Sequence, residues 1–224
     1  AEFEESRIKA KVLSSPWPEF SLLETLLWTE NEGFFLLERH LARLKNSAKY
    51  FDIAFSETEI LNILKDTATG KQDSSLKVRL LLSHSGQASC SAEQISISPQ
   101  PLSTSVVLAR EAVSSKNVFL YHKTDYRDLY ERHSAESPDS ADVLLWNERG
   151  ELTESTIANL VLEVQGKLLT PPISCGLLPG VFRAELLAAG TIKEEILTLG
   201  MLKKASSIYL VNSVRKWQKA TMLS

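Results

Sequence analysis

The chain has 224 residues, of which 43% are hydrophobic and 24% charged, and its net charge is −3. These values are typical of a soluble globular protein and leave no basic surface for nucleic acid. No apolar run reaches the length of a membrane span, so neither nucleic acid nor a membrane is an expected partner. The two cysteines, Cys90 and Cys175, lie far apart and predict free thiols in a reducing, cytoplasmic compartment.

The first eighteen residues are interpreted as a linker or N-terminal extension. They combine a charged stretch with a Pro-Trp-Pro break that ends at Pro18. Because the chain begins with Ala1 rather than Met, we expect it to be a fragment of a longer protein.

Residues 19–98 predict an N-terminal α/β subdomain. Apolar residues recur at steps of four and three from Leu37 to Phe51, which is the pattern of an amphipathic helix. Ser56 followed by Glu59 forms a capping box at the start of a second helix. The remaining predicted elements are an apolar strand before a hairpin turn at residues 30–33, a half-buried strand at 76–82 and another strand at 94–98.

A proline- and serine-rich stretch at residues 99–105 is the predicted interdomain loop. Residues 106–224 predict a C-terminal α/β subdomain, so the fold class is α+β with an active site expected between two subdomains. The predicted elements of this half are a strand at 106–110, a buried strand at 118–121 that ends before Lys123, a strand at 142–146 followed by a turn and a polar segment, two strands around residues 165–166, a helix at 180–190, and a strand, short helix and strand over 194–214.

Several common catalytic motifs are absent from the sequence. It contains no G-x-S-x-G, P-loop, G-x-G-x-x-G or H-E-x-x-H pattern. The four histidines are scattered without ligand spacing, so no metal is expected.

What remains is a set of residues with complementary chemistry. Lys123 follows an apolar run, where burial lowers the pKa of an amine and makes it nucleophilic. Glu154 lies among hydroxyl residues, while Arg43, Asn212, Ser213 and the N–H groups of "LLPGVFR" are donors suited to a phosphate. Each is ordinarily a surface or loop residue when considered alone. Together they match the needs of pyridoxal 5′-phosphate: an amine for a Schiff base, a carboxylate beside the ring nitrogen and an anion-binding cup.

The order and wording of these segments resemble the fold-type IV pyridoxal-phosphate enzymes, which include branched-chain and D-amino-acid aminotransferases and aminodeoxychorismate lyases. The matching segments are "LLETLLW", "ERHLARLKNSAKYF", "HKTDYR", "ELTESTIANLVLE", "LLTPPISCGLLPGVFR" and "YLVNSVR". The resemblance implies the D-amino-acid aminotransferase-like architecture of two α/β subdomains, assembled as a homodimer with the site near the interface. It also implies that Lys123 forms the Schiff base, Glu154 contacts the ring nitrogen, Leu178 packs against the ring, and Arg43, Val181, Phe182, Asn212 and Ser213 bind the phosphate.

Within that family the chain is most similar to aminodeoxychorismate lyases, especially those fused behind aminodeoxychorismate synthase. This similarity implies release of pyruvate from 4-amino-4-deoxychorismate to yield para-aminobenzoate for folate synthesis. Arg127 would hold a substrate carboxylate, and Thr25 would help proton transfer. The segment around Thr25 lacks the glycines common in these lyases, so the site entrance is altered. The alternatives are a D-amino-acid or branched-chain aminotransferase and a non-catalytic binding domain on the same scaffold.

Overall fold

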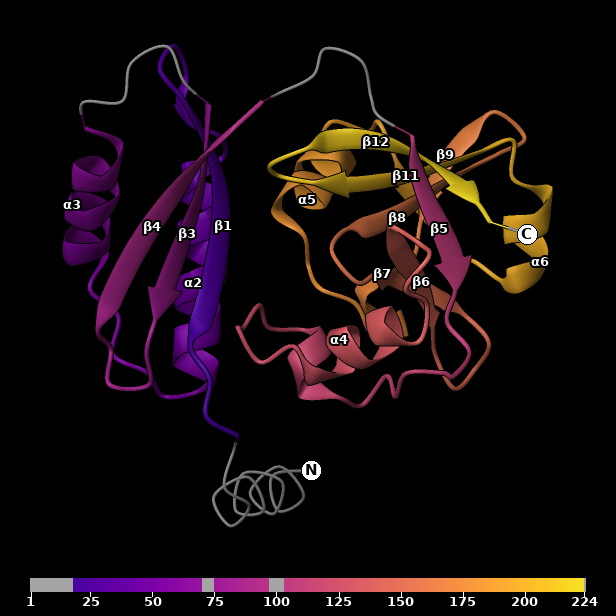
Figure 1. Cartoon of the computed structure of the whole chain (residues 1–224), viewed down its shortest axis with the longest axis horizontal. Helices are drawn as coiled ribbons and strands as arrows, with labels where there is room; N and C mark the ends of the chain where they lie inside the picture. Colours follow the sequence, from indigo (N-terminus) through magenta and orange to yellow (C-terminus); the bar gives the residue numbers. More distant parts are fainter. Residues whose placement is uncertain (1–17, 70–74, 97–102, 224) are drawn as a thin grey trace.

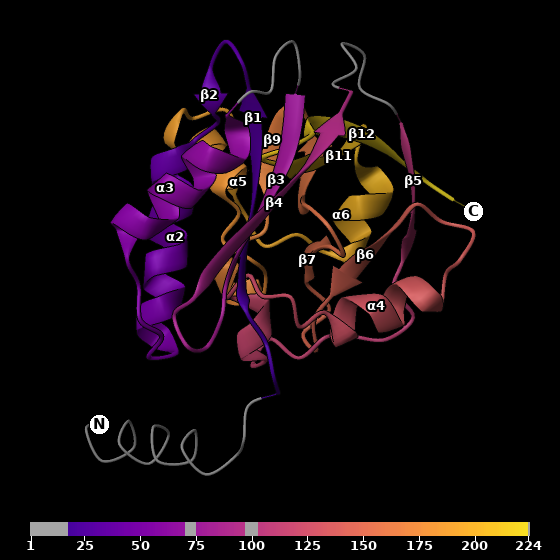
Figure 2. The same cartoon turned by 60° about the vertical axis from the view of Figure 1, so that its left-hand side comes forward.

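The first of two sheets has four antiparallel strands in the order β2-β1-β3-β4 (Figure 1). The structure is a computed structural model that describes residues 18–69, 75–96 and 103–223. Helices α2 and α3 cover one face of this sheet, as both views show (Figures 1 and 2). The elements are β1 (Leu22–Thr29), β2 (Gly33–Phe34), α2 (Leu37–Tyr50), α3 (Glu57–Ala68), β3 (Ser75–Leu82) and β4 (Ala88–Ile95).

The local signals in this half produce the predicted elements. The apolar stripe of α2 packs on the sheet, and the Ser56 side chain accepts a hydrogen bond from the Glu59 N–H at 3.5 Å at the start of α3. In β3, Leu76 and its alternate neighbours are buried against the helices, which turns Lys77 and Arg79 toward the other face. The predicted strand at 94–98 is only partly correct, because β4 runs from Ala88 to Ile95; residues 97–98 of the prediction lie outside the described residues.

The second sheet follows the order β10-β9-β8-β11-β12-β5-β6-β7. An additional pairing between β7 and β8 closes the strands from β8 to β7 into a ring, so most edges are paired. Its helices are α4 (Asp128–Ala135), α5 (Val181–Ala188) and α6 (Leu199–Lys204). Its strands are β5 (Thr104–Leu108), β6 (Asp142–Trp146), β7 (Leu152–Ser155), β8 (Asn159–Val164), β9 (Lys167–Thr170), β10 (Lys193–Glu194), β11 (Ser207–Asn212) and β12 (Lys216–Met222).

Two predictions in this half are wrong. The run at 118–121 is the 3₁₀ helix η1 (Val118–Leu120) and not a strand, because the Asn117 side chain accepts from the Phe119 N–H at 3.0 Å and closes a turn. Four apolar residues are too few to separate strand from helix by periodicity. The polar segment after Gly150 is the buried strand β7, and α4 and β12 were not predicted.

The two sheets stand side by side, and the chain passes from one to the other between Ile95 and Thr104 (Figure 1). The predicted linker at residues 1–18 and the predicted interdomain loop at 99–105 lie mostly outside the described residues. Within the described ranges, no helix is long and apolar enough to cross a membrane.

Candidate active site

A cavity of about 380 Å³ lies between the two sheets. One wall comes from β1, α2 and β3, and the opposite wall comes from β7, β8, the start of α5 and the β11–β12 turn. Of the site residues predicted from the sequence, those that line it are Thr25, Arg43, Lys123, Arg127, Glu154, Leu178, Val181, Asn212 and Ser213. Their chemical roles stay predictions.

Lys123 lies in the loop after η1 and is tied to the first sheet. Its carbonyl accepts a hydrogen bond from the Leu23 N–H at 2.9 Å. Burial, followed by the positive charge of Arg43, lowers the pKa of the Lys123 amine to about 8. The amine has no hydrogen-bond or ion-pair partner among the described residues. A neutral fraction near physiological pH makes this amine a candidate nucleophile and base.

Glu154 is the carboxylate of the opposite wall and is only 3% exposed on β7. It accepts hydrogen bonds from the Tyr130 hydroxyl at 2.8 Å and from the Asn159 amide and the Leu178 N–H, both at 3.2 Å. Burial raises the pKa of Glu154 to about 7 despite these donors and the charges of Lys123 and Arg127, because no cation among the described residues lies within ion-pair distance of the carboxylate. A cationic group brought into the cavity would therefore be stabilised beside it.

Arg43 is anchored by a buried acid that sequence reasoning missed. Its Nε and Nη2 atoms donate to the two carboxylate oxygens of Glu24 at 2.8 and 2.6 Å, and His40 Nδ1 lies 2.7 Å from the same carboxylate. Burial alone would raise the pKa of Glu24, but Arg43 and His40 together lower it to about 2. The available signal was an acid within an apolar strand, on the same side as Leu22 and Leu26.

The start of α5 places uncapped N–H groups, which are donors suited to an anion, beside Arg43. Arg43 Nη1 donates to the Pro179 carbonyl at 3.1 Å, and no side chain caps the helix that begins at Val181. A side chain at Gly180 would displace Asn159, because a Cβ at this position would lie 1.8 Å from Asn159 Oδ1. Exposed N–H groups at a helix start attract anions.

Phe182 is the predicted site residue that does not line the cavity. Its ring packs in the core beside Phe35 and Trp217, with ring centroids 5.8 and 6.5 Å away. The prediction concerned its backbone N–H, which stays in the first turn of α5.

Further polar residues line the cavity. Arg127 Nη2 donates to the Thr156 carbonyl at 2.6 Å, and its guanidinium lies 4.8 Å from the centre of the Tyr130 ring. Lys77, Arg79 and Arg215, none of which was predicted, also line it. Lys77 and Arg79 come from the face of β3 that the helices leave uncovered, a position that strand alternation indicates.

The residues present fit pyridoxal phosphate. The fit rests on an amine and a buried carboxylate that make no ion pair among the described residues, and on an uncapped helix start beside an arginine, all on one cavity. These groups match the aldehyde, the ring nitrogen and the phosphate respectively.

Comparisons with known proteins agree with this chemistry. The family model for class IV amino-transferases matches residues 21–222. A Schizosaccharomyces pombe protein provisionally named aminodeoxychorismate lyase is 32% identical over 214 residues, which cover 92% of this chain and 90% of that protein. Among solved structures, a protein from Mesorhizobium loti provisionally named an amino-acid aminotransferase is 37% identical, with a TM-score of 0.86 over 92% of this chain and 100% of that one.

A more distant structure shares the fold alone. It comes from Legionella pneumophila, is provisionally named 4-amino-4-deoxychorismate lyase, and is 21% identical with a TM-score of 0.79 over 92% of this chain and 84% of that one. The chain therefore belongs to the class IV amino-transferase family and is a pyridoxal-phosphate-dependent enzyme of fold type IV.

Proposed function

We propose that this enzyme is a 4-amino-4-deoxychorismate lyase that releases pyruvate and para-aminobenzoate. The observation that carries the proposal is that one cavity is lined by both the Lys123 amine, which has no hydrogen-bond partner among the described residues, and the buried Glu154 carboxylate. The similarity to the Schizosaccharomyces pombe protein, which extends over nearly all of both chains, supports the lyase as the specific activity.

The cofactor phosphate is assigned to Arg43 and the start of α5. Arg43 is oriented by Glu24 and contacts the Pro179 carbonyl, one residue before Gly180. The N–H groups of Val181 and Phe182 and the side chains of Asn212 and Ser213 would complete the cup. When bound, pyridoxal phosphate supplies a carbon that joins the substrate amine and a ring that accepts electrons from a breaking bond.

Lys123 and Glu154 are assigned the proton chemistry. Glu154, with its raised pKa, would accept a hydrogen bond from the ring nitrogen and keep that nitrogen protonated. Lys123, with its lowered pKa, would take the proton from the substrate ring carbon that carries the amine. It would then deliver a proton to the departing ether oxygen on the neighbouring carbon. The bond from the ring to that oxygen then breaks, so pyruvate leaves as its enol and the ring becomes aromatic. Leu178 would pack on the cofactor ring, and Thr25 would assist proton transfer.

The surplus of cations in the cavity supports a substrate with two carboxylates. Pyruvate and para-aminobenzoate each carry one, so their parent carries both. Arg127 stacks on the ring of Tyr130, whose hydroxyl donates to Glu154. Arg79 and Arg215 also line the cavity. We assign one substrate carboxylate to Arg127, since a guanidinium binds carboxylates in a fork geometry.

The deciding experiment is an assay of the purified protein with 4-amino-4-deoxychorismate and pyridoxal phosphate. Equimolar para-aminobenzoate and pyruvate are expected. Amino-group transfer to a keto acid without para-aminobenzoate would refute the lyase and establish the second candidate, a D-amino-acid or branched-chain aminotransferase. That candidate is kept because the Mesorhizobium loti protein, which is provisionally named an amino-acid aminotransferase, is 37% identical.

We also propose that the enzyme works as a homodimer in a reducing, cytoplasmic compartment. Ile157 lines the cavity yet is 58% exposed, an apolar position that a second subunit would cover. Cys90 and Cys175 are free thiols, as expected where disulfides do not form. Sedimentation of the purified protein tests the dimer: a single monomeric species would contradict it.

A further inference from the structure

We propose that Arg149 is a positioning residue that holds the chain segments leading to Lys123, Glu154 and Leu178 in one arrangement. The inference rests on the proposed roles of Lys123 and Glu154. Arg149 itself does not line the cavity and touches none of the groups assigned to the cofactor or substrate.

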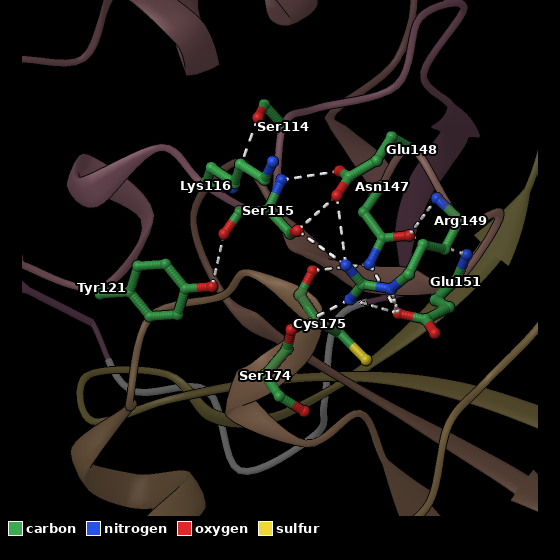
Figure 3. A network of polar contacts seen from close by, with 10 residues as sticks. All are labelled: Ser114, Ser115, Lys116, Tyr121, Asn147, Glu148, Arg149, Glu151, Ser174 and Cys175. Atoms are coloured by element: carbon green, nitrogen blue, oxygen red, sulfur yellow. Dashed lines mark hydrogen bonds and ion pairs between the residues drawn. The ribbon is translucent and has the colours of Figure 1, made fainter. Parts of the chain in front are cut away.

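Arg149 joins segments that are distant in the sequence (Figure 3). From the β6–β7 turn, its Nη1 donates to Ser115 Oγ at 2.8 Å, and its Nη2 donates to the Ser174 carbonyl at 3.0 Å. Its Nε and Nη2 also donate to Glu151 Oε2 at 2.9 and 2.7 Å, and Nη1 donates to Glu148 Oε1 at 3.1 Å. One guanidinium therefore bridges three loops with its fixed fork of donors.

The first loop leads directly to Lys123. The Ser115 N–H donates to Glu148 Oε2 at 2.7 Å, and the Tyr121 hydroxyl donates to the Ser115 carbonyl at 2.6 Å (Figure 3). The segment between Ser115 and Tyr121 is thereby closed on itself around the buried Leu120. Lys123 follows two residues later, so a shift of Ser115 is transmitted to it.

The other two loops lead to the opposite wall. Asn147, which is fully buried, donates through Nδ2 to Glu151 Oε2 at 2.7 Å and to the Cys175 carbonyl at 2.8 Å. Glu151 precedes Glu154 on the chain that becomes β7, and Cys175 precedes Leu178. Glu154 and Leu178 then meet in the site, where the Leu178 N–H donates to Glu154 at 3.2 Å.

A close backbone approach shows that these loops are packed together. Gly176 has a φ of +92°, and a Cβ there would lie 2.9 Å from the Ser115 Cα. Only glycine allows this contact without displacing Ser115. The segment before Lys123 and the segment before Leu178 are therefore in direct contact beneath the site, with Arg149 bonded to both.

The exposure of Arg149 makes positioning separable from stability. Its side chain is 44% exposed, and exposed ion pairs contribute little to the free energy of unfolding. Replacing it should therefore change the melting temperature less than a core substitution while changing the site more. Leu202→Ala provides the control, because Leu202 is the buried residue of α6 and does not line the cavity.

The experiment compares Arg149→Met, Arg149→Lys and Leu202→Ala in the full chain. The Lys123 amine is titrated without cofactor by trace acetylation with acetic anhydride at a series of pH values, with mass spectrometry of its peptide. Hydrogen exchange of residues 114–123 is measured on the same samples. For Arg149→Met we expect the titration midpoint of the Lys123 amine to lie at a higher pH and the hydrogen exchange of residues 114–123 to be faster. We also expect kcat/KM to be roughly 100-fold lower. Arg149→Lys, which keeps the charge without the fork, should recover part of each.

Leu202→Ala should lower the melting temperature and leave the Lys123 midpoint and the exchange of residues 114–123 unchanged. Equal Lys123 midpoints and exchange rates in Arg149→Met and the wild-type protein would overturn the proposal. A failure of the role proposed for Lys123 looks different: borohydride reduction of the wild-type protein with pyridoxal phosphate would then leave no cofactor mass on the Lys123 peptide. The cofactor-free titration still tests Arg149 in that case.

Discussion

Glu24 and Glu154 are two buried glutamates beside the same cavity with opposite electrostatic behaviour. Their exposures are 1% and 3%, so burial penalises both carboxylates. Arg43 and His40 reverse this penalty at Glu24, where the pKa falls to about 2. At Glu154 the neutral donors and the charges of Lys123 and Arg127, which are not in ion-pair contact, do not reverse it, and the pKa rises to about 7. A cation next to a buried acid therefore decides whether the acid is a permanent anion or a proton acceptor near neutral pH.

The largest expected effect comes from removing the amine that faces both acids. Lys123→Ala should lower kcat by at least about 1,000-fold, because the chain loses its nucleophile and its proton carrier. Turnover and borohydride trapping of the cofactor measure this loss. The exposed Lys167 provides the control, since Lys167→Ala should keep both. Full turnover by Lys123→Ala would refute the assignment of the lysine.

The second prediction separates the two acids by their effect on folding. Glu24→Gln should lower the free energy of unfolding by about 3–5 kcal/mol, because it breaks a buried ion pair and strands Arg43. Glu154→Gln should not destabilise the protein at neutral pH, because it removes a carboxylate that burial penalises, but it should lower kcat by about 100-fold. Urea unfolding and steady-state kinetics test both.

Equal losses of stability in Glu24→Gln and Glu154→Gln would contradict the comparison. The control is Glu131→Gln, which alters an exposed carboxylate on α4 and should leave the free energy of unfolding within about 0.5 kcal/mol of wild type.

The third prediction is that the two acids give opposite pH dependence. The folded pKa of Glu24 is about 2 against an ordinary 4.5, so its stabilisation is present above pH 4.5 and lost as pH falls toward 2. The folded pKa of Glu154 is about 7, so its penalty is absent below pH 4.5 and grows as pH rises to 7. Each change amounts to about 3 kcal/mol.

Unfolding of the cofactor-free protein across both pH windows, compared with each glutamine variant, measures these slopes. Slopes of the same sign for the two acids would rule out the electrostatic difference between them.

The smallest expected effect concerns a neutral donor to Glu154. Tyr130→Phe removes the hydrogen bond of 2.8 Å to Glu154 Oε1 and should lower the free energy of unfolding by about 1 kcal/mol. Because that bond lowers the pKa of Glu154, its removal should raise the pKa further. Infrared titration of the carboxyl group measures this change. Tyr50→Phe, which alters an exposed ring, is the control, and a lowered Glu154 pKa in Tyr130→Phe would contradict the prediction.

The sequence predicted much of the fold because its signals are local. The stripe of α2, the cap at Ser56 and the alternation of β3 each follow from a few neighbouring residues, and the structure confirms them. The predicted strand before Lys123 was wrong because its local signal is too short: four apolar residues do not show whether the period is that of a strand or of a helix. Arg43 was predicted, but its partner Glu24 lies 19 residues away and was not.

The sequence by itself determined the family, the cofactor and nine of the residues that line the cavity, because these follow from residue types in a fixed order along the chain. Only the tertiary structure decided the electrostatics. It set Arg43 beside Glu24, left Glu154 without an ion-pair contact among the described residues, and joined the loops that precede Lys123 and Leu178 through Arg149. The pKa of a buried group depends on which charges and donors surround it in space, and residues far apart in the sequence supply them.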